Sequence, residues 1–289
     1  MAKLLFNGAC TALVTPFLNG KLNYPMAELL LRRQIAAGMD AVVLAGTTGE
    51  SPTLSDEEKM ELFRRCKQYA EDSCKIIAGT GSNCTAHAVE LSAAAEDIGV
   101  DGLLVVSPYY NKATPDGLVA HYMSIAHAVS IPIIIYNVPS RTGVDIPVSV
   151  YKRLSVIPNI AGVKEASNDI TKIARIRMAC GPDFGIWSGN DDQIVPAIAS
   201  GANGVISVLS NVFPRETIAL CQEALEGDFT KAAALQRHYL PLIDLLFCEV
   251  NPIPVKAAMK CIGYDCGGCR LPLTSLTTEN QKKMETYFA

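Results

Sequence analysis

The sequence predicts an α/β fold, namely a (β/α)8 TIM barrel with a small C-terminal helical domain. Eight short apolar runs rich in β-branched residues recur along the chain, and stretches with helical periodicity separate them. Continuously apolar strands that alternate with helices are typical of a parallel sheet covered by helices, and eight such units close a barrel. From about residue 226 only helical patterns remain. We therefore expect a catalytic barrel over residues 1–225 and a helical domain over residues 226–289.

The strand pattern occurs eight times before residue 226. We expect strands at residues 8–17, 41–46, 75–80, 102–108, 132–137, 160–166, 184–189 and 204–208. Helical patterns lie between them, at residues 25–37, 55–72, 85–98, 116–129, 147–155, 169–179 and 191–200.

Several predicted helices have recognisable ends. Ser55 and Glu58 have the spacing of a capping box, in which the side chain of each bonds to the backbone N–H of the other. Pro147 suits the first turn of a helix, where its missing N–H costs no hydrogen bond. Glycine accepts the left-handed conformation that commonly ends a helix. We expect such C-caps at Gly38, Gly99 and Gly201.

Composition and charge narrow the functional classes. The 289 residues are 49% hydrophobic and carry a net charge of −4. The basic pairs at residues 32–33, 64–65 and 282–283 fit solvated helix faces, so we expect no nucleic-acid partner. No apolar run reaches the ~20 residues of a membrane span, and the N-terminal apolar residues lack the pattern of a secretory signal. We therefore expect a cytoplasmic protein with no membrane partner and mostly reduced cysteines.

In a barrel of this kind the active site lies at the C-terminal ends of the strands. Hydroxyl groups, phenols, a guanidinium and an amine are expected to meet there. The residues concerned are Thr47 and Thr48 after the second strand, Tyr109 and Tyr110 after the fourth, Tyr136 and Arg141 at and beyond the fifth, Lys164 in the sixth, Gly189 in the seventh, and Ile206 and Ser207 in the eighth.

Lys164 is the most informative of these residues, because the apolar run at 160–166 otherwise has the pattern of a buried strand. Desolvation favours the neutral amine, and a neutral amine can attack a carbonyl to form a Schiff base. Tyr136, one strand away, can move protons while the carbinolamine forms and loses water. The hydroxyl and amide groups of residues 46–49 can hold a small carboxylate, and Arg141 can bind a second carboxylate through a bidentate fork.

Other kinds of catalysis find little support. None of the four histidines falls at a strand end, where the ligands of a catalytic metal would be needed. Asp191 and Asp192 fit the N-cap and first turn of the helix after the seventh strand. Residues 79–81 lack the third glycine and the acidic partner of a dinucleotide fingerprint. The three cysteines between residues 261 and 269 have neither a second C-x-x-C pair nor a His pair nearby. We therefore expect no metal and no cofactor.

Five motifs carry a resemblance to a known family. They are GTTGE at 46–50, PYYN at 108–111, YNVPSRTG at 136–143, GVKEA at 162–166 and NPIPVK at 251–256. Together and in this order they resemble the dihydrodipicolinate synthase family, which belongs to the pyruvate-dependent class I aldolase superfamily. The resemblance covers nearly the whole chain and weakens after about residue 260. The lysine-bearing strand alone would identify only the superfamily.

The resemblance implies a reaction and an assembly. Lys164 would form a Schiff base with pyruvate, and the enamine would attack L-aspartate semialdehyde in the diaminopimelate and lysine pathway. Family members form a tight dimer, commonly paired into a tetramer, so the resemblance implies a homotetramer built as a dimer of dimers. They use a Thr-Tyr-Tyr proton relay in which the second tyrosine comes from a neighbouring subunit. The relay matches Thr47, Tyr136 and Tyr110. The other implied contacts are Thr48 with the pyruvate carboxylate, Arg141 with the semialdehyde carboxylate, and the backbones of Gly189 and Ile206 along the site.

Two other functions stay open from the sequence. One is that of a sister lyase, such as N-acetylneuraminate lyase or a sugar-acid aldolase. Those enzymes typically have Ser-Thr where this chain has Thr47-Thr48, and they lack an equivalent of Arg141. The other is that of a non-catalytic protein that binds carbonyl compounds or amino acids, against which the intact set of lysine, tyrosine and threonine argues.

The chain also departs from lysine-sensitive relatives in one pocket. Their regulatory site resembles Ser51, Asn83 and Tyr109 here. This chain has His87 where a carboxylate is usual, and Asp56 and Lys59 where histidines are common. Loss of a carboxylate and gain of a cation should weaken the binding of a cationic amino acid. We therefore expect little or no inhibition by L-lysine.

Overall fold

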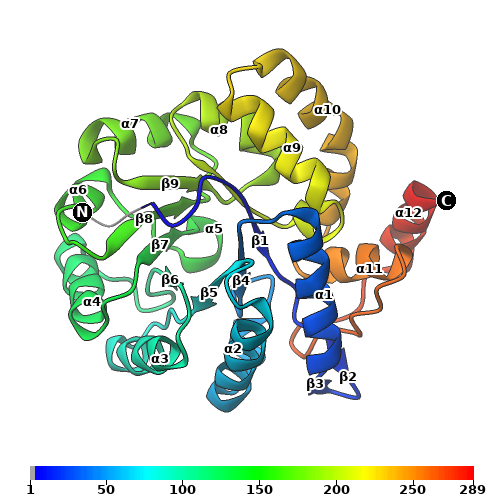
Figure 1. Ribbon diagram of the computed structural model, residues 1–289, viewed down its shortest axis with the longest axis horizontal. Helices are drawn as coiled ribbons and strands as arrows, with labels where there is room; N and C mark the ends of the chain where they lie inside the picture. The colour runs from blue at the N-terminus through cyan, green and yellow to red at the C-terminus, as the bar shows by residue number, and fades with distance from the viewer. Residues whose placement is uncertain (1–3) are drawn as a thin grey trace.

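A closed barrel of eight parallel strands forms the centre of the computed structural model, which describes residues 4–289 (Figure 1). The strands are β1 (Gly8–Ala12), β4 (Ala41–Leu44), β5 (Lys75–Gly79), β6 (Gly102–Val106), β7 (Ile133–Asn137), β8 (Ile160–Glu165), β9 (Gly185–Ser188) and β10 (Gly204–Ser207). They follow one another around the barrel in chain order, and β1 closes it by pairing with both β4 and β10. The predicted fold class is confirmed.

A ring of helices surrounds the barrel (Figure 1). It consists of α1 (Tyr24–Ala37), α2 (Asp56–Ala70), α3 (Thr85–Ile98), α4 (Pro115–Ala128), α6 (Val148–Leu154), α7 (Ile170–Cys180), α8 (Ile194–Ala199) and α9 (Pro214–Leu225). Short helices lie in the loops over the barrel mouth: η1 (Ser51–Thr53), α5 (Pro139–Thr142), η2 (Asp191–Gln193) and η3 (Leu209–Asn211).

Three helices follow the barrel, as the sequence predicts. They are α10 (Phe229–Leu246), α11 (Ile253–Cys261) and α12 (Thr278–Phe288). Figure 1 shows α10 along α9, whereas α11 and α12 extend to the side of the molecule next to α1. The division into residues 1–225 and 226–289 stays a prediction. No helix among the described residues is long and apolar enough to cross a membrane.

The first predicted strand is too long. Barrel pairing ends at Ala12, and the chain then forms a small antiparallel hairpin from β2 (Phe17–Leu18) and β3 (Lys21–Leu22). The backbone N–H of Phe17 donates to the carbonyl of Cys266 at 2.9 Å. The chain therefore leaves the barrel to pair with a segment about 250 residues later, which local periodicity cannot indicate.

The prediction for Asp191 is also wrong. Asn190, not Asp191, is the N-cap, and η2 precedes the shorter helix α8. The Asp191 carboxylate instead accepts hydrogen bonds from the backbone N–H groups of Val208 and Leu209, both at 2.9 Å. It thereby fixes the loop after β10, a role that depends on tertiary contact.

The predicted helix ends are correct where the cap is local. The Ser55 hydroxyl accepts from the Glu58 N–H at 3.2 Å, and the Glu58 carboxylate accepts from the Ser55 N–H at 3.0 Å. Gly38 and Gly99 end α1 and α3 in the left-handed conformation. Two predictions were displaced by one residue, because Pro147 is the N-cap of α6 and Ser200 is the C-cap of α8 ahead of Gly201.

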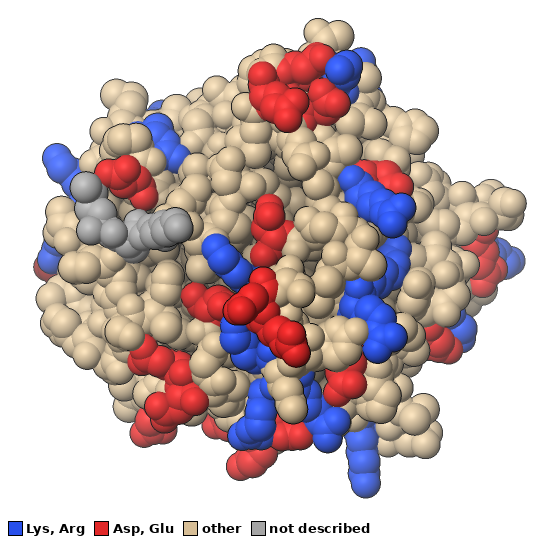
Figure 2. Space-filling view, in the orientation of Figure 1, with Lys and Arg blue, Asp and Glu red and all other residues tan. Residues whose placement is uncertain are grey.

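The interior of the barrel is packed with side chains, as expected for eight strands. Trp187 is fully buried there and stacks on Phe6 with ring centroids 4.7 Å apart. Ile206 and Tyr136 belong to the same buried cluster. On the face drawn in Figure 2, basic side chains of the described residues form a column on the right, acidic ones gather at the top, and both signs mix in the lower centre.

Candidate active site

Lys164 and Tyr136 lie side by side at the barrel mouth. They are partners in the parallel register of β8 and β7, so their side chains emerge on the same face of the sheet. The Lys164 Nζ lies 4.6 Å from the centroid of the Tyr136 ring, and both residues are buried. They line a cavity of about 410 Å³.

Four lysines are buried in the described chain, and ion pairing separates one of them from the rest. Lys59 pairs with Asp56, Lys172 with Asp145 and Glu165, and Lys256 with Glu50. Within residues 4–289, Lys164 has no carboxylate oxygen within 4.0 Å. Its amine is therefore free of a fixed counter-ion, which suits a nucleophile.

Gly189 provides room for the Lys164 side chain. A Cβ atom at this position would lie 2.6 Å from the Ala166 Cβ and 3.0 Å from the Lys164 Cε. The Gly189 N–H also donates to the Glu165 carbonyl at 2.7 Å, which brings the two strand ends together. Any larger residue at position 189 would have to displace the lysine or its neighbour.

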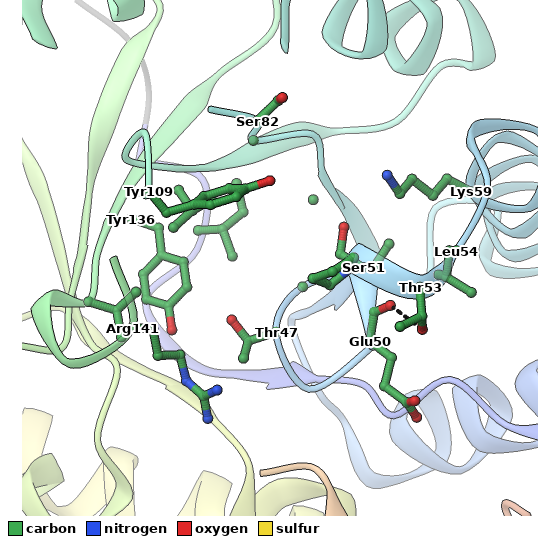
Figure 3. A pocket seen from close by; sticks show the side chains of 18 of the residues that line it. Thr47, Glu50, Ser51, Thr53, Leu54, Lys59, Ser82, Tyr109, Tyr136 and Arg141 are labelled. Carbon is green, nitrogen blue, oxygen red and sulfur yellow. Dashed lines mark hydrogen bonds between the residues drawn. The ribbon is translucent and has the colours of Figure 1, made fainter. Parts of the chain in front are cut away.

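The Thr47-Thr48 loop forms a second wall of the cavity. It lies between two residues in the left-handed region, Ala45 with φ of 49° and Glu50 with φ of 54°. The Asn251 amide donates to the Thr48 hydroxyl oxygen at 2.9 Å. The hydroxyl hydrogen of Thr48 is then left to be donated to a ligand. Figure 3 shows the hydroxyl groups of Thr47 and Tyr136 facing each other across the cavity.

Arg141 lies on the short helix α5 with its guanidinium beside the phenol of Tyr136 (Figure 3). It is exposed, and its Nη2 donates to the Asn251 carbonyl at 3.4 Å. No carboxylate of the described chain lies within ion-pairing distance of it. Its donor fork is therefore available to an anion.

Two buried carboxylates support the neighbourhood of Lys164. The Glu165 side chain accepts from the Asn137 amide at 2.8 Å and from the Tyr151 hydroxyl at 3.2 Å. Burial, together with the adjacent Glu165 charge, raises the pKa of Tyr151, so this phenol remains a hydrogen-bond donor. Burial also raises the pKa of Asp191, against the opposing effect of its own hydrogen bonds.

The structure brings most of the predicted site residues together. Six of them line the cavity: Thr47, Thr48, Tyr136, Arg141, Lys164 and Gly189. Two do not. Tyr110 is 92% exposed and lies away from it, and Ile206 is fully buried in the core while Val208 lines the cavity instead. The predicted roles of Tyr110 and of the Ile206 backbone stay predictions.

Sequence reasoning missed the contribution of the C-terminal helices. Asn251 contacts Thr48 and Arg141, and Phe247 also lines the cavity. The NPIPVK motif was the available signal, but its residues are more than 80 positions from Lys164, and no local pattern assigns them to the mouth.

The cavity continues into a second hollow of about 490 Å³ towards α2 and α3. Thr47, Tyr136 and Arg141 line both. Of the predicted regulatory residues, the second hollow is lined by Ser51, Asp56, Lys59, His87 and Tyr109. Asn83 does not line it, and its side-chain amide donates to the Tyr109 carbonyl at 3.2 Å.

No three His, Cys, Asp or Glu side chains of residues 4–289 gather in a way that could hold a metal ion. Cys261, Cys266 and Cys269 are free thiols. That the reaction needs neither metal nor cofactor stays a prediction.

Comparison with known proteins agrees with this geometry. A family model described as the dihydrodipicolinate synthetase family matches residues 5–288. The chain belongs to this family. It is 46% identical over 280 residues to the 4-hydroxy-tetrahydrodipicolinate synthase of Alkaliphilus oremlandii, with 97% of each chain covered. The predicted family is therefore confirmed.

Two solved members of the family carry ligands. The enzyme from Cyanidioschyzon merolae with lysine bound has a TM-score of 0.96 and 39% identity, covering 99% of this chain and 98% of its own. The chloride-inhibited dihydrodipicolinate synthase from Acinetobacter baumannii complexed with pyruvate has a TM-score of 0.95 and 40% identity, with 97% of both chains covered.

Proposed function

We propose that this chain is a 4-hydroxy-tetrahydrodipicolinate synthase, a lyase that condenses pyruvate with L-aspartate semialdehyde for diaminopimelate and lysine biosynthesis. The observation that carries the proposal is Lys164, a buried amine without a carboxylate partner, next to a phenol and opposite paired threonine hydroxyls. Homologues that the chain covers almost completely have this activity in their names.

The proposed reaction proceeds through covalent intermediates on Lys164. The Lys164 amine adds to the ketone carbon of pyruvate, water leaves, and the resulting iminium draws electrons from the neighbouring carbon. Loss of a proton from the pyruvate methyl group then gives an enamine. The enamine carbon attacks the aldehyde carbon of the second substrate, and the aldehyde oxygen takes up a proton. Closure of the ring by the substrate's own amino group releases Lys164.

The hydroxyl groups around Lys164 supply the proton transfers and hold the first substrate. Tyr136 and Thr47 face each other and form two members of the proposed proton relay (Figure 3). Tyr110 is the third member, and its exposure fits a side chain that enters the site of a neighbouring copy. Thr48, whose oxygen already accepts from Asn251, donates its hydrogen to the pyruvate carboxylate.

Arg141 selects the second substrate. Its unpaired guanidinium binds the carboxylate of the semialdehyde through two parallel hydrogen bonds. A sister lyase that cleaves N-acetylneuraminate or a sugar acid would not be expected to have this arginine together with Thr47-Thr48. We also propose that the protein is a cytoplasmic homotetramer built as a dimer of dimers.

Borohydride trapping tests the proposal. The wild type incubated with pyruvate and borohydride should gain one pyruvate-derived mass on Lys164. Lys164→Ala and Lys164→Arg should gain none while keeping a native circular dichroism spectrum, because a guanidinium does not form this imine. A stable adduct on another buried lysine, such as Lys172, would overturn the assignment.

A panel of aldehydes separates the remaining alternatives. The trapped enzyme intermediate should be consumed by L-aspartate semialdehyde in preference to N-acetylmannosamine and to simple sugar aldehydes. Efficient cleavage of N-acetylneuraminate would establish the sister-lyase function. Absence of any adduct in the wild type would leave a non-catalytic binding protein.

A further inference from the structure

A buried ion pair joins the active-site loop to the C-terminal helices. The Glu50 Oε1 lies 2.5 Å from the Lys256 Nζ, and the two side chains are 0% and 4% exposed. Glu50 ends the loop that carries Thr47 and Thr48, whereas Lys256 lies on α11. The pair therefore spans about 200 residues of sequence and ties together two parts of the chain that local structure leaves independent.

Further contacts fix the geometry of this pair. The Glu50 Oε2 accepts from the backbone N–H of Arg270 at 2.9 Å, and Lys256 Nζ donates to the Gly268 carbonyl at 3.0 Å. The Lys256 ammonium also lies 4.4 Å from the centroid of the Phe17 ring. Both charged groups are thus anchored on more than one side, as buried charges require.

The pair is well placed to set the position of Thr47 and Thr48. Glu50 is held in the left-handed region, and two residues earlier the Thr48 hydroxyl is bonded to Asn251, just before α11. On the barrel side, the Thr15 hydroxyl donates to the Gly49 carbonyl at 2.7 Å. The loop is therefore held between the barrel and the C-terminal helices.

Neither charge serves the chemistry directly. Glu50 lines only the second hollow, and in Figure 3 its carboxylate points away from the hydroxyl of Tyr136. Lys256 lines neither hollow. A buried ion pair is also a poor source of net stability, because desolvation of the charges offsets their attraction. What such a pair provides efficiently is one defined arrangement of the segments it joins.

We propose that Glu50 and Lys256 are positioning residues for the first substrate, holding the Thr47-Thr48 loop where the Thr48 hydroxyl can bind the pyruvate carboxylate. The inference rests on the proposed function, since it assigns the ligand of that loop. It makes the C-terminal helices part of the pyruvate site, although they contribute no group to the reaction.

The experiment compares Lys256→Met, Glu50→Gln and the double variant. Pyruvate affinity is measured as half-saturation of borohydride trapping on Lys164, and steady-state kinetics give the KM for each substrate. Each single variant should raise pyruvate half-saturation by about five- to tenfold, because a displacement of about 1 Å at a binding group has effects of this order or larger. The KM for the semialdehyde should change by less than about twofold, since Arg141 governs that substrate.

The double variant tests whether the pair acts as a unit. The pyruvate concentration at half-saturation should equal that of the single variant with the larger increase. It should not rise by the product of the two single increases. Arg177→Met is the matched control. Arg177 is a partly buried cation that bonds to the carbonyls of Gly201 and Phe184, beside the starts of β10 and β9 and away from the mouth. The Arg177→Met substitution should lower the melting temperature without changing pyruvate half-saturation.

The outcomes distinguish this inference from the proposed function. If the wild type forms no adduct with pyruvate, the proposed function itself is wrong. If the wild type forms the adduct and Lys256→Met binds pyruvate within about twofold of it, only the positioning role is wrong. Equal increases in half-saturation for both substrates would show a general structural role and overturn the inference. The same conclusion would follow if Arg177→Met, at the same loss of melting temperature, raised pyruvate half-saturation as much.

Discussion

Burial alone does not make a lysine reactive, as the other three buried lysines among residues 4–289 show. Lys59, Lys172 and Lys256 are as well buried as Lys164, yet each has a carboxylate beside it. An amine committed to an ion pair must break that pair before it can attack a carbonyl. The contacts of each side chain, rather than its depth, therefore single out Lys164.

Another single residue, Arg141, should determine the affinity for the second substrate. Arg141→Ala should raise the KM for L-aspartate semialdehyde and lower kcat/KM, while pyruvate trapping on Lys164 remains. The loss of a bidentate carboxylate contact corresponds to about 1.5–3 kcal/mol. Arg141→Lys should recover only part of it, because a point charge cannot reproduce the fork. An unchanged KM for the semialdehyde in Arg141→Ala would contradict the assignment.

The burial of His121 predicts that the stability of the protein depends on pH. It is 3% exposed on α4, its Nδ1 lies 3.0 Å from the Thr85 hydroxyl, and burial lowers its pKa to about 4. Below about pH 6.5 the unfolded chain takes up a proton that the folded chain refuses, so stability should fall as the pH decreases from about 6.5 to about 4. The loss should approach about 3 kcal/mol at the lower end.

Denaturant unfolding of the wild type and of His121→Gln between pH 7 and pH 4.5 measures this effect. Other groups titrate in both proteins, so the difference between the two slopes is the quantity of interest. Parallel stability curves for the two proteins would show that His121 does not contribute.

At the scale of elements, the turn after β9 predicts a steric effect on catalysis. Gly189→Ala would place a methyl group 2.6 Å from the Ala166 Cβ and 3.0 Å from the Lys164 Cε. The rate of pyruvate trapping should fall by about tenfold or more, since the amine can no longer take up its position. Gly117→Ala on α4, whose nearest contacts would be 3.4 Å, is the control and should trap at the normal rate. Normal trapping in Gly189→Ala would exclude this constraint.

Helices α2 and α3 contribute Asp56, Lys59 and His87 to the second hollow, where we expect the response to lysine to be decided. Asp56 is bonded to His87 at 2.9 Å and paired with Lys59 at 3.4 Å. Burial of Asp56, which alone would raise its pKa, is outweighed by these two partners, and its pKa lies below the usual value. The one carboxylate among these residues is thus already engaged, which supports the expectation of weak lysine binding.

Titration with L-lysine should therefore give no half-inhibition at low millimolar concentration. His87→Glu should increase sensitivity, because it supplies a carboxylate where lysine-sensitive relatives have one. Lysine is bound in the solved relative from C. merolae, so binding is possible in this family. Half-inhibition of the wild type below the millimolar range would prove the expectation wrong.

At the scale of the whole molecule, a single chain does not bring all three members of the proposed relay together. Tyr110 projects into solvent with φ of 71°, whereas Thr47 and Tyr136 line the cavity. An exposed aromatic pair such as Tyr109-Tyr110 is typical of an interface. We therefore expect sedimentation at assay concentrations to show a homotetramer, and a fully active monomer would contradict this.

Subunit mixing tests the same expectation through activity. Lys164→Ala and Tyr110→Phe should each have little activity alone. When the two are unfolded together and refolded, mixed dimers contain one site with Lys164 from one subunit and Tyr110 from the other. Random pairing should restore roughly a quarter of wild-type activity. No recovery in refolded mixtures that contain mixed dimers would show that Tyr110 does not act across the interface.

The sequence by itself determined the barrel, the order of its strands, the local helix caps and the residues at the strand ends. These follow from interactions between near neighbours: hydrophobic periodicity, caps such as Ser55 with Glu58, and a fold rule that places every strand end at one mouth. Six of the eight predicted site residues line the cavity for this reason.

Only the tertiary structure decided which groups support them. Four contacts join segments that lie far apart in the chain. They are the Glu50–Lys256 pair, the Asn251 bond to Thr48, the Asp191 carboxylate bonds to the loop after β10, and the Phe17 bond to the Cys266 carbonyl. Such contacts leave no periodic signal, because their energy comes from burial and geometry that exist only once the chain has folded.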